Sequence, residues 1–279
     1  MKIGIVTSFG DIHDYLTMAR EAEYHGWDGV FAWDDICIGP REVFYPWVTL
    51  GAMAAVTERI TLGAMVFSLA RRRPWKVARE TLTLDNLSNG RLVIPVGLGG
   101  EWDGGYSRVN TDQPARKVRA EKLDECLAIL EKAWMGDPFD FEGTHYRATN
   151  LEFQPRPVQR PRVPIWTVGA WPYERSLARS ARWDGIVVAD MSPEATPGQD
   201  ISPKTIRAIK AWMGERRSPR DPFDIVVEGV TDGADPEGTR ARLAPLAEAG
   251  ATWWIESRWA DGESAETLLE RIRQGPPQV

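Results

Sequence analysis

Eight short apolar runs alternate with eight amphipathic stretches, and this alternation limits the possible folds more than any other feature of the chain. Strict alternation of strands and helices implies a parallel sheet, and a count of eight favours a closed barrel. The predicted strands are Ile3–Ser8, Gly29–Trp33, Ile60–Val66, Leu92–Val96, Pro164–Val168, Gly185–Ala189, Phe223–Gly229 and Thr252–Ile255. The predicted helices lie near Tyr15–His25, Pro46–Val56, Pro74–Leu87, Ala115–Trp134, Pro172–Arg182, Pro203–Arg216, Pro236–Ala249 and Ala265–Arg273.

The whole chain, residues 1–279, is therefore predicted to form a single α/β domain, a (β/α)8 TIM barrel. Its length fits, because barrels of this kind typically use about 250 residues as one domain. An open, doubly wound sheet is the structural alternative. One segment interrupts the alternation: Asp137–Val163 holds a predicted hairpin at Phe139–Tyr146 and then a proline-rich stretch. We expect a short hairpin insertion before the fifth strand.

The composition excludes some classes of partner. The formal net charge is −6, from 34 basic and 40 acidic residues, whereas a nucleic-acid or anionic-membrane surface calls for a basic patch. We expect neither partner. Two cysteines, Cys37 and Cys126, do not make a disulfide scaffold. The sequence begins directly in a predicted strand, and no apolar run is long enough to span a bilayer, so we expect a cytoplasmic protein.

Glycines follow two of the predicted strands, at the strand ends where barrels carry their functional sites. The fourth strand runs directly into Gly97-Leu98-Gly99-Gly100, and bare backbone there lets a ligand approach closely. The fifth ends in Gly169-Ala170-Trp171, just before a helix whose free N–H groups and dipole favour an anion such as phosphate. We predict that Gly169, Ala170 and Trp171 contact a phosphate, with an ordinary strand-to-helix turn as the alternative.

An acid pair, Asp34 and Asp35, follows the second strand. Adjacent residues of a strand point in different directions, so one carboxylate is expected to face the barrel mouth while the other caps or pairs. A carboxyl group near the apolar Trp33 can have a raised pKa and act as an acid or a base. Asp35 is therefore a candidate catalytic residue, and a loop-capping acid pair is the alternative.

Of three histidines, only His13 lies beyond the carboxyl end of a strand, which makes it the second catalytic candidate. The alternative is that it starts the first helix, with Asp11 or Asp14 as the cap. The histidines lack ligand spacing, so we predict no zinc or iron site. Asp190, after the sixth strand, is a candidate cofactor contact. A magnesium site built from Asp34, Asp190 and Glu256 stays open.

Several segments together resemble the bacterial-luciferase-like flavin and deazaflavin oxidoreductases. They are "LDNLSNGR" before the segment Gly97–Gly100, which we call the glycine rim, "EAEYHGWDGV" and "TERITLG" upstream of it, and "PRPVQRPRVPIW" before the fifth strand. The resemblance implies a barrel with a non-proline cis peptide at Met65-Val66 that presses on the cofactor ring, and it places Gly97, Leu98 and Gly99 beside that ring. Leu98 stands where bacterial luciferase has an arginine, and Asp35 stands where many members have a histidine.

The resemblance predicts a monooxygenase that uses reduced FMN and dioxygen on a small organic substrate, with Asp35 or His13 moving the proton. The alternatives are hydride transfer with a deazaflavin (coenzyme F420), a non-catalytic flavin-binding protein, and a flavin-free barrel enzyme. The expected partners are the flavin, a small-molecule substrate and a flavin reductase, and the family resemblance also implies a homodimer.

Overall fold

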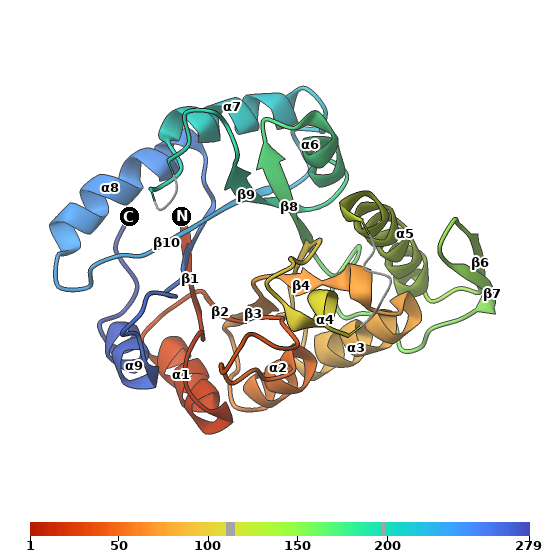
Figure 1. Cartoon of the computed structure of the whole chain (residues 1–279), viewed down its shortest axis with the longest axis horizontal. Coiled ribbons are helices and arrows are strands. Elements are labelled where there is room, and N and C mark those ends of the chain that lie inside the picture. The colour runs from red at the N-terminus through yellow and green to blue at the C-terminus, as the bar shows by residue number, and fades with distance from the viewer. Residues whose placement is uncertain (110–114, 197–198) are drawn as a thin grey trace.

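The computed structural model describes residues 1–109, 115–196 and 199–279, and in it the strands form a ring surrounded by helices (Figure 1). The strands of the main sheet are β1 (Lys2–Val6), β2 (Gly29–Ala32), β3 (Thr61–Ala64), β4 (Phe67–Ser68), β5 (Ile94–Gly97), β8 (Ile165–Trp171), β9 (Gly185–Asp190), β10 (Asp224–Gly229) and β11 (Trp253–Glu256). The helices are α1 (Ile12–Tyr24), α2 (Pro46–Ala55), α3 (Pro74–Leu87), α4 (Gly104–Ser107), α5 (Arg116–Met135), α6 (Glu174–Ser180), α7 (Pro203–Gly214), α8 (Pro236–Ala249) and α9 (Ala265–Arg273), with a 3-10 turn, η1, at Leu69–Arg71.

The sheet is parallel throughout and runs β3-β2-β1-β11-β10-β9-β8-β5-β4. A bridge between Leu62 of β3 and Leu92, just before β5, closes the sheet: the Leu62 N–H donates to the Arg91 carbonyl and the Val93 N–H to the Leu62 carbonyl, both at 2.9 Å. Because β3 and β4 together fill the third position, the nine strands make eight positions of a TIM barrel. The predicted fold is therefore confirmed, and the open sheet is excluded.

The eight predicted helices are all present, and so is the insertion. Its hairpin pairs β6 (Phe139–Glu142) with β7 (Arg147–Leu151) in an antiparallel ladder, and it lies outside the helix ring beside α5 (Figure 1). The third predicted strand, Ile60–Val66, is interrupted at Met65-Val66, where the peptide bond is cis. None of the helices in the described ranges combines the length and the apolar character that crossing a membrane requires.

Aromatic side chains fill the barrel toward the amino ends of its strands. Phe31, Trp166 and Trp253 are buried with ring centroids 5.3 to 6.2 Å apart. Glycines make room for them, since a Cβ atom on Gly4 or Gly29 would lie 2.6 or 2.7 Å from Phe31 Cε2. Side chains that fill one end of a barrel leave open space only at the other end. The interior therefore opens toward the carboxyl ends of the strands.

Candidate functional site

A cavity of about 730 Å³ lies at the carboxyl ends of the strands, bounded by residues of β4, β5, β8, β9 and β10, by the loop after β2, and by α5 and α6. Of the residues predicted from the sequence, its lining includes Asp35, Met65, Val66, Gly97, Leu98, Gly99 and Ala170. His13, Gly169, Trp171 and Asp190 are not part of that lining. The structure thus brings the glycine rim, the third strand end and both residues of the acid pair, Asp34 and Asp35, to a common site.

The cis peptide bond that the family resemblance implies is present at Met65-Val66, and both residues line the cavity. Gly97 faces Val66 across the wall: a Cβ atom on Gly97 would lie 2.8 Å from Val66 Cγ2 and 3.4 Å from Val168 Cγ2. A side chain at position 97 would push these valines toward the space that a ligand needs. The third, fourth and fifth strand positions therefore form one apolar wall.

Gly99 has a second role that the sequence did not reveal. Its φ of +70° is in the left-handed region, which favours glycine, and a Cβ atom would lie 2.2 Å from Tyr106 Cε2. The missing side chain thus also makes room for the Tyr106 ring of the protein itself. A larger residue at position 99 would disturb the loop as well as any bound ligand.

The two carboxylates of the acid pair have different roles, as predicted: Asp34 is paired with arginines, and Asp35 is not paired with any in the described parts of the chain. Asp34 is almost fully buried and accepts hydrogen bonds from the Ser68 N–H (2.8 Å) and from Arg71 (2.7 Å), while Arg72 forms a further ion pair with it. Arg71 also pairs with the buried carboxylate of Asp103, which caps α4. This network holds the loop after β2 against the rest of the barrel mouth.

Asp35 is half-buried and lines the cavity. Burial, reinforced by the negative charge of Asp103, raises the pKa of Asp35 to about 6. A carboxyl group with this pKa exchanges a proton near neutral pH, as a general acid or base requires. The structure therefore offers Asp35 as a proton-exchanging group at the cavity wall, and its catalytic role stays a prediction.

Glu228, on β10, is a second carboxyl group of the cavity. Alternation along β10 turns Glu228 into the barrel two residues after Val226, where its side chain lines the open cavity and is exposed in it. Desolvation by the surrounding barrel raises the pKa of Glu228 to about 7, although the side chain is exposed in the open cavity. Its place at the end of the seventh predicted strand was a signal in the sequence, but nothing there separated it from other strand-end residues.

Three arginines from outside the strands reach the cavity: Arg116 and Arg119 on α5 and Arg179 on α6. Arg119 is only 8% exposed, and its Nε has no hydrogen-bond acceptor among the residues that the structure describes. Arg179 is oriented by Asp124, which accepts from Nε and Nη2 at 2.5 and 2.9 Å. A buried guanidinium without an acceptor is costly unless an anion satisfies it. The sequence carried no signal for this cluster, because its arginines come from two helices, α5 and α6, that only packing brings to the same cavity.

The interpretation of Gly169-Ala170-Trp171 as a turn at a helix start was wrong. All three residues belong to β8, and Trp171 pairs with Asp190 of β9, so the helix begins only at Glu174. The Ala170 N–H donates to Ser176 Oγ at 2.9 Å, and a Cβ atom on Gly169 would point away from the cavity, 2.2 Å from Ile186 Cδ1. The structure thus turns Ala170 and Ser176 toward the cavity, and Gly169 toward the helices.

The other candidates lie outside the cavity. His13 is exposed on the first turn of α1, where Asp11 forms a capping box with Asp14, so the helix-start alternative is the observed one. Asp190 accepts hydrogen bonds from Ser192 and Thr205. Partial burial raises its pKa, but these bonds outweigh burial, and the pKa of Asp190 lies below its ordinary value.

The magnesium site left open by the sequence is not assembled. The Asp34 carboxylate is paired with Arg71 and Arg72. The Asp190 carboxylate accepts hydrogen bonds from Ser192 and Thr205, and the Glu256 carboxylate accepts them from Thr231 and Arg258. Within residues 1–109, 115–196 and 199–279, no group of three or more His, Cys, Asp or Glu side chains is arranged to hold a metal ion.

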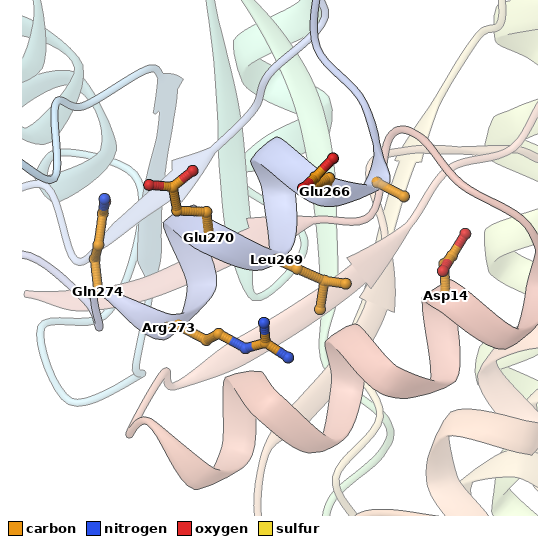
Figure 2. A pocket seen from close by; sticks show the side chains of 7 residues that line it. Asp14, Glu266, Leu269, Glu270, Arg273 and Gln274 are labelled. Atoms are coloured by element: carbon orange, nitrogen blue, oxygen red, sulfur yellow. The ribbon is translucent and has the colours of Figure 1, made fainter.

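A separate hollow of about 580 Å³ lies on the outer surface between α1 and α9. Figure 2 shows Asp14 on α1 opposite Glu266, Leu269, Glu270, Arg273 and Gln274 on α9. It is lined mainly by charged and polar surface side chains, and it is not formed by strand ends. We therefore place the functional site in the barrel mouth.

The cavity combines an apolar wall with buried positive charge. The wall of Met65, Val66 and Gly97 is apolar and includes bare backbone, while Arg119 is buried and its Nε has no acceptor among the residues that the structure describes. Fold and site together show a TIM barrel with an apolar wall and buried positive charge at its mouth. The chain belongs to the luciferase-like monooxygenase family, whose model matches residues 1–237.

Three relatives similar to this chain carry the same name, F420-dependent glucose-6-phosphate dehydrogenase. An F420-dependent glucose-6-phosphate dehydrogenase of Beutenbergia cavernae is 31% identical over 291 residues, which span 93% of this chain and 82% of that protein. Proteins of the same name from Microbacterium testaceum and Nakamurella multipartita are 28% and 31% identical, over 74% and 58% of this chain. Those two matches span only 60% and 48% of the relatives' own lengths.

Two solved structures share the fold. An F420-dependent secondary alcohol dehydrogenase superposes with a TM-score of 0.79 at 16% identity, covering 99% of this chain and 98% of the other. The oxygenating component of a diketocamphane monooxygenase from Pseudomonas putida, solved with FMN, has a TM-score of 0.73 at 13% identity, with coverages of 98% and 96%. At this identity the likeness establishes the fold and leaves the cofactor open.

Proposed function

We propose that this chain is an oxidoreductase that uses the deazaflavin coenzyme F420 to transfer a hydride to or from a small organic substrate. The main observation in support is the match to a relative named as F420-dependent over 93% of this chain. This proposal replaces the FMN monooxygenase expected first from the sequence with the alternative weighed beside it. When bound, the deazaflavin supplies the hydride chemistry.

The residues of the cavity divide into three groups under this proposal. Met65, Val66, Gly97, Leu98 and Gly99 form the surface against which the ring packs and from which water is excluded. Arg119 binds the phosphate, assisted by Arg116 and Arg179 and by the polar edge at Ala170 and Ser176. Asp35 holds or releases the substrate proton at its carboxyl oxygens.

Leu98 removes one support for FMN. Bacterial luciferase has an arginine at the matching position, and this chain supplies its buried cation from Arg119 on α5 instead. FMN is the second candidate, because a structure of similar fold was solved with FMN.

The test is a titration of the purified protein with F420 and, separately, with FMN, followed by cofactor fluorescence and by the quenching of tryptophan emission. We expect saturable binding of F420 at micromolar concentrations and weaker binding of FMN. Tighter binding of FMN, followed by oxygen consumption when the flavin is reduced, would restore the monooxygenase hypothesis. If neither cofactor binds, the protein is a flavin-free barrel.

The expected partners stay proposals. A flavin reductase is required only if the cofactor is reduced FMN. The family resemblance implies a homodimer. Light scattering on the purified chain measures the molar mass in solution and tests this.

A further inference from the structure

The cavity has an uneven distribution of charge. All of its lining arginines come from α5 and α6 and lie on the side of β8, where Arg179 is already paired with Asp124. The remaining charged side chains of the lining are carboxylates: Asp34, which Arg71 and Arg72 already neutralise, and Asp35, Glu101 and Glu228. Within the described residues of the lining, no lysine, arginine or histidine lies outside the α5–α6 cluster.

Glu228 faces the wall on which we place the cofactor ring. In the closed ring of strands, β10 lies four positions from β3 and from β4, counted in either direction, so Glu228 and Met65-Val66 are on opposite sides of the barrel mouth. The space between them is where a substrate must lie to contact the exposed face of the ring. This step rests on the proposed function.

The Glu228 carboxylate has no protein partner in the described parts of the chain. Desolvation inside the barrel raises its pKa, although the side chain is exposed in the open cavity, and the apolar Val168 of β8 and Val187 of β9 line the same cavity. A carboxyl group in such surroundings gains most from a ligand that donates a hydrogen bond, and it repels a ligand that carries negative charge.

We propose that Glu228 is a substrate-binding residue and that it selects a substrate with an uncharged hydroxyl group over a phosphate ester. Once the arginine cluster holds the phosphate of the cofactor, no cation of the described lining is left to neutralise a second phosphate. The Glu228 carboxyl group accepts a hydrogen bond from the substrate hydroxyl, and the apolar wall packs on its carbon skeleton. The substrate class therefore differs from that in the name of the sequence relatives.

The test compares three probes with the same ring and different head groups: cyclohexanol, cyclohexyl phosphate and cyclohexylamine. Calorimetry measures their binding to the F420-loaded protein and to the unloaded protein. We expect cyclohexanol to bind the loaded protein about tenfold or more tightly than cyclohexyl phosphate, because the phosphate faces uncompensated negative charge. Absence of cyclohexanol binding, or tighter binding of the phosphate, overturns the proposal. Tighter binding of the amine overturns it in favour of a cationic substrate.

Two variants separate hydrogen bonding from charge. Glu228→Leu removes both and is expected to weaken cyclohexanol binding about tenfold, the effect of one hydrogen bond to a charged group. Glu228→Gln keeps an acceptor and removes the charge, so it should retain cyclohexanol within about threefold and bind cyclohexyl phosphate more tightly. Unchanged affinities in Glu228→Gln overturn the proposal even if the leucine variant fails to fold.

Glu248→Gln is the matched control, because it removes the same charge from an exposed position on α8, outside the cavity. Its probe affinities should equal those of the wild type. Binding of F420 itself is measured on every variant. If F420 binds but the protein binds the three probes equally well, the inference about Glu228 fails while the proposed function stands. If F420 does not bind, the proposed function fails, and the probe affinities of the unloaded protein still show whether Glu228 discriminates.

Discussion

Replacing Arg119 by methionine is expected to change cofactor binding and stability in different ways. Arg119 is 8% exposed, its Nε lacks an acceptor among the described residues, and its guanidinium lies 5.2 Å from the centroid of the Tyr106 ring. Methionine keeps much of the length and packing of the side chain without its charge. The two effects therefore separate the binding role of Arg119 from its structural role.

The binding effect follows from the loss of a charge-assisted contact. Hydrogen bonds to charged groups contribute about 1.5–3 kcal/mol, so the dissociation constant for F420 should rise by about tenfold to about 150-fold. The free energy of unfolding should change little or increase. Removing an unsatisfied buried group relieves a cost of about 1–3 kcal/mol, against about 0.5–1 kcal/mol lost from the cation–π contact. We expect the free energy of unfolding to stay level or to rise by up to about 2 kcal/mol.

Fluorescence titration with F420 and denaturant unfolding measure the two quantities on the same preparations. Arg175→Met is the matched control, because Arg175 is exposed on α6 and lies outside the cavity lining. Wild-type affinity in Arg119→Met would refute the phosphate assignment, and an equal loss in Arg175→Met would show a nonspecific charge effect. A marked loss of stability in Arg119→Met would show that the guanidinium is satisfied within the folded chain.

Two further predictions concern Asp35 and Gly169. Because the folded-state pKa of Asp35 is raised to about 6, its ionisation opposes folding once the pH rises above the ordinary value of 3.8. Asp35→Asn should therefore gain stability relative to the wild type between about pH 4 and about pH 6 and hold that gain above. Denaturant unfolding across this pH range measures the difference in free energy of unfolding between the variant and the wild type, and a difference that does not change with pH would contradict the raised pKa. In Asp35→Asn, turnover should also fall more than the affinity for F420. Gly169→Ala should destabilise the protein by about 1–3 kcal/mol, because its Cβ atom would lie 2.2 Å from Ile186 Cδ1. The folded fraction should nevertheless bind F420 like the wild type, since this side of β8 faces the helices; weaker binding by correctly folded protein would assign Gly169 to the cofactor site.

The sequence alone determined the architecture and the end of the barrel at which the cavity opens. The alternation of apolar runs and amphipathic helices is a local pattern that repeats within a few residues, and it is visible without any tertiary contact. The hairpin insertion and the glycine rim were found for the same reason, because turn residues punctuate the chain locally. The roles of Asp34 and Asp35 were separable in outline, since neighbouring residues on a strand point apart.

Only the tertiary structure decided which side chains share the cavity. Arg119 comes from α5, outside the strand ends, and packing of that helix places it in the barrel mouth. The same packing gives Asp34 to two arginines, turns Gly169 toward Ile186, and leaves Glu228 facing the cavity. The physical reason is that burial and charge pairing depend on residues distant in the chain, whereas the pattern that specifies a strand or a helix does not.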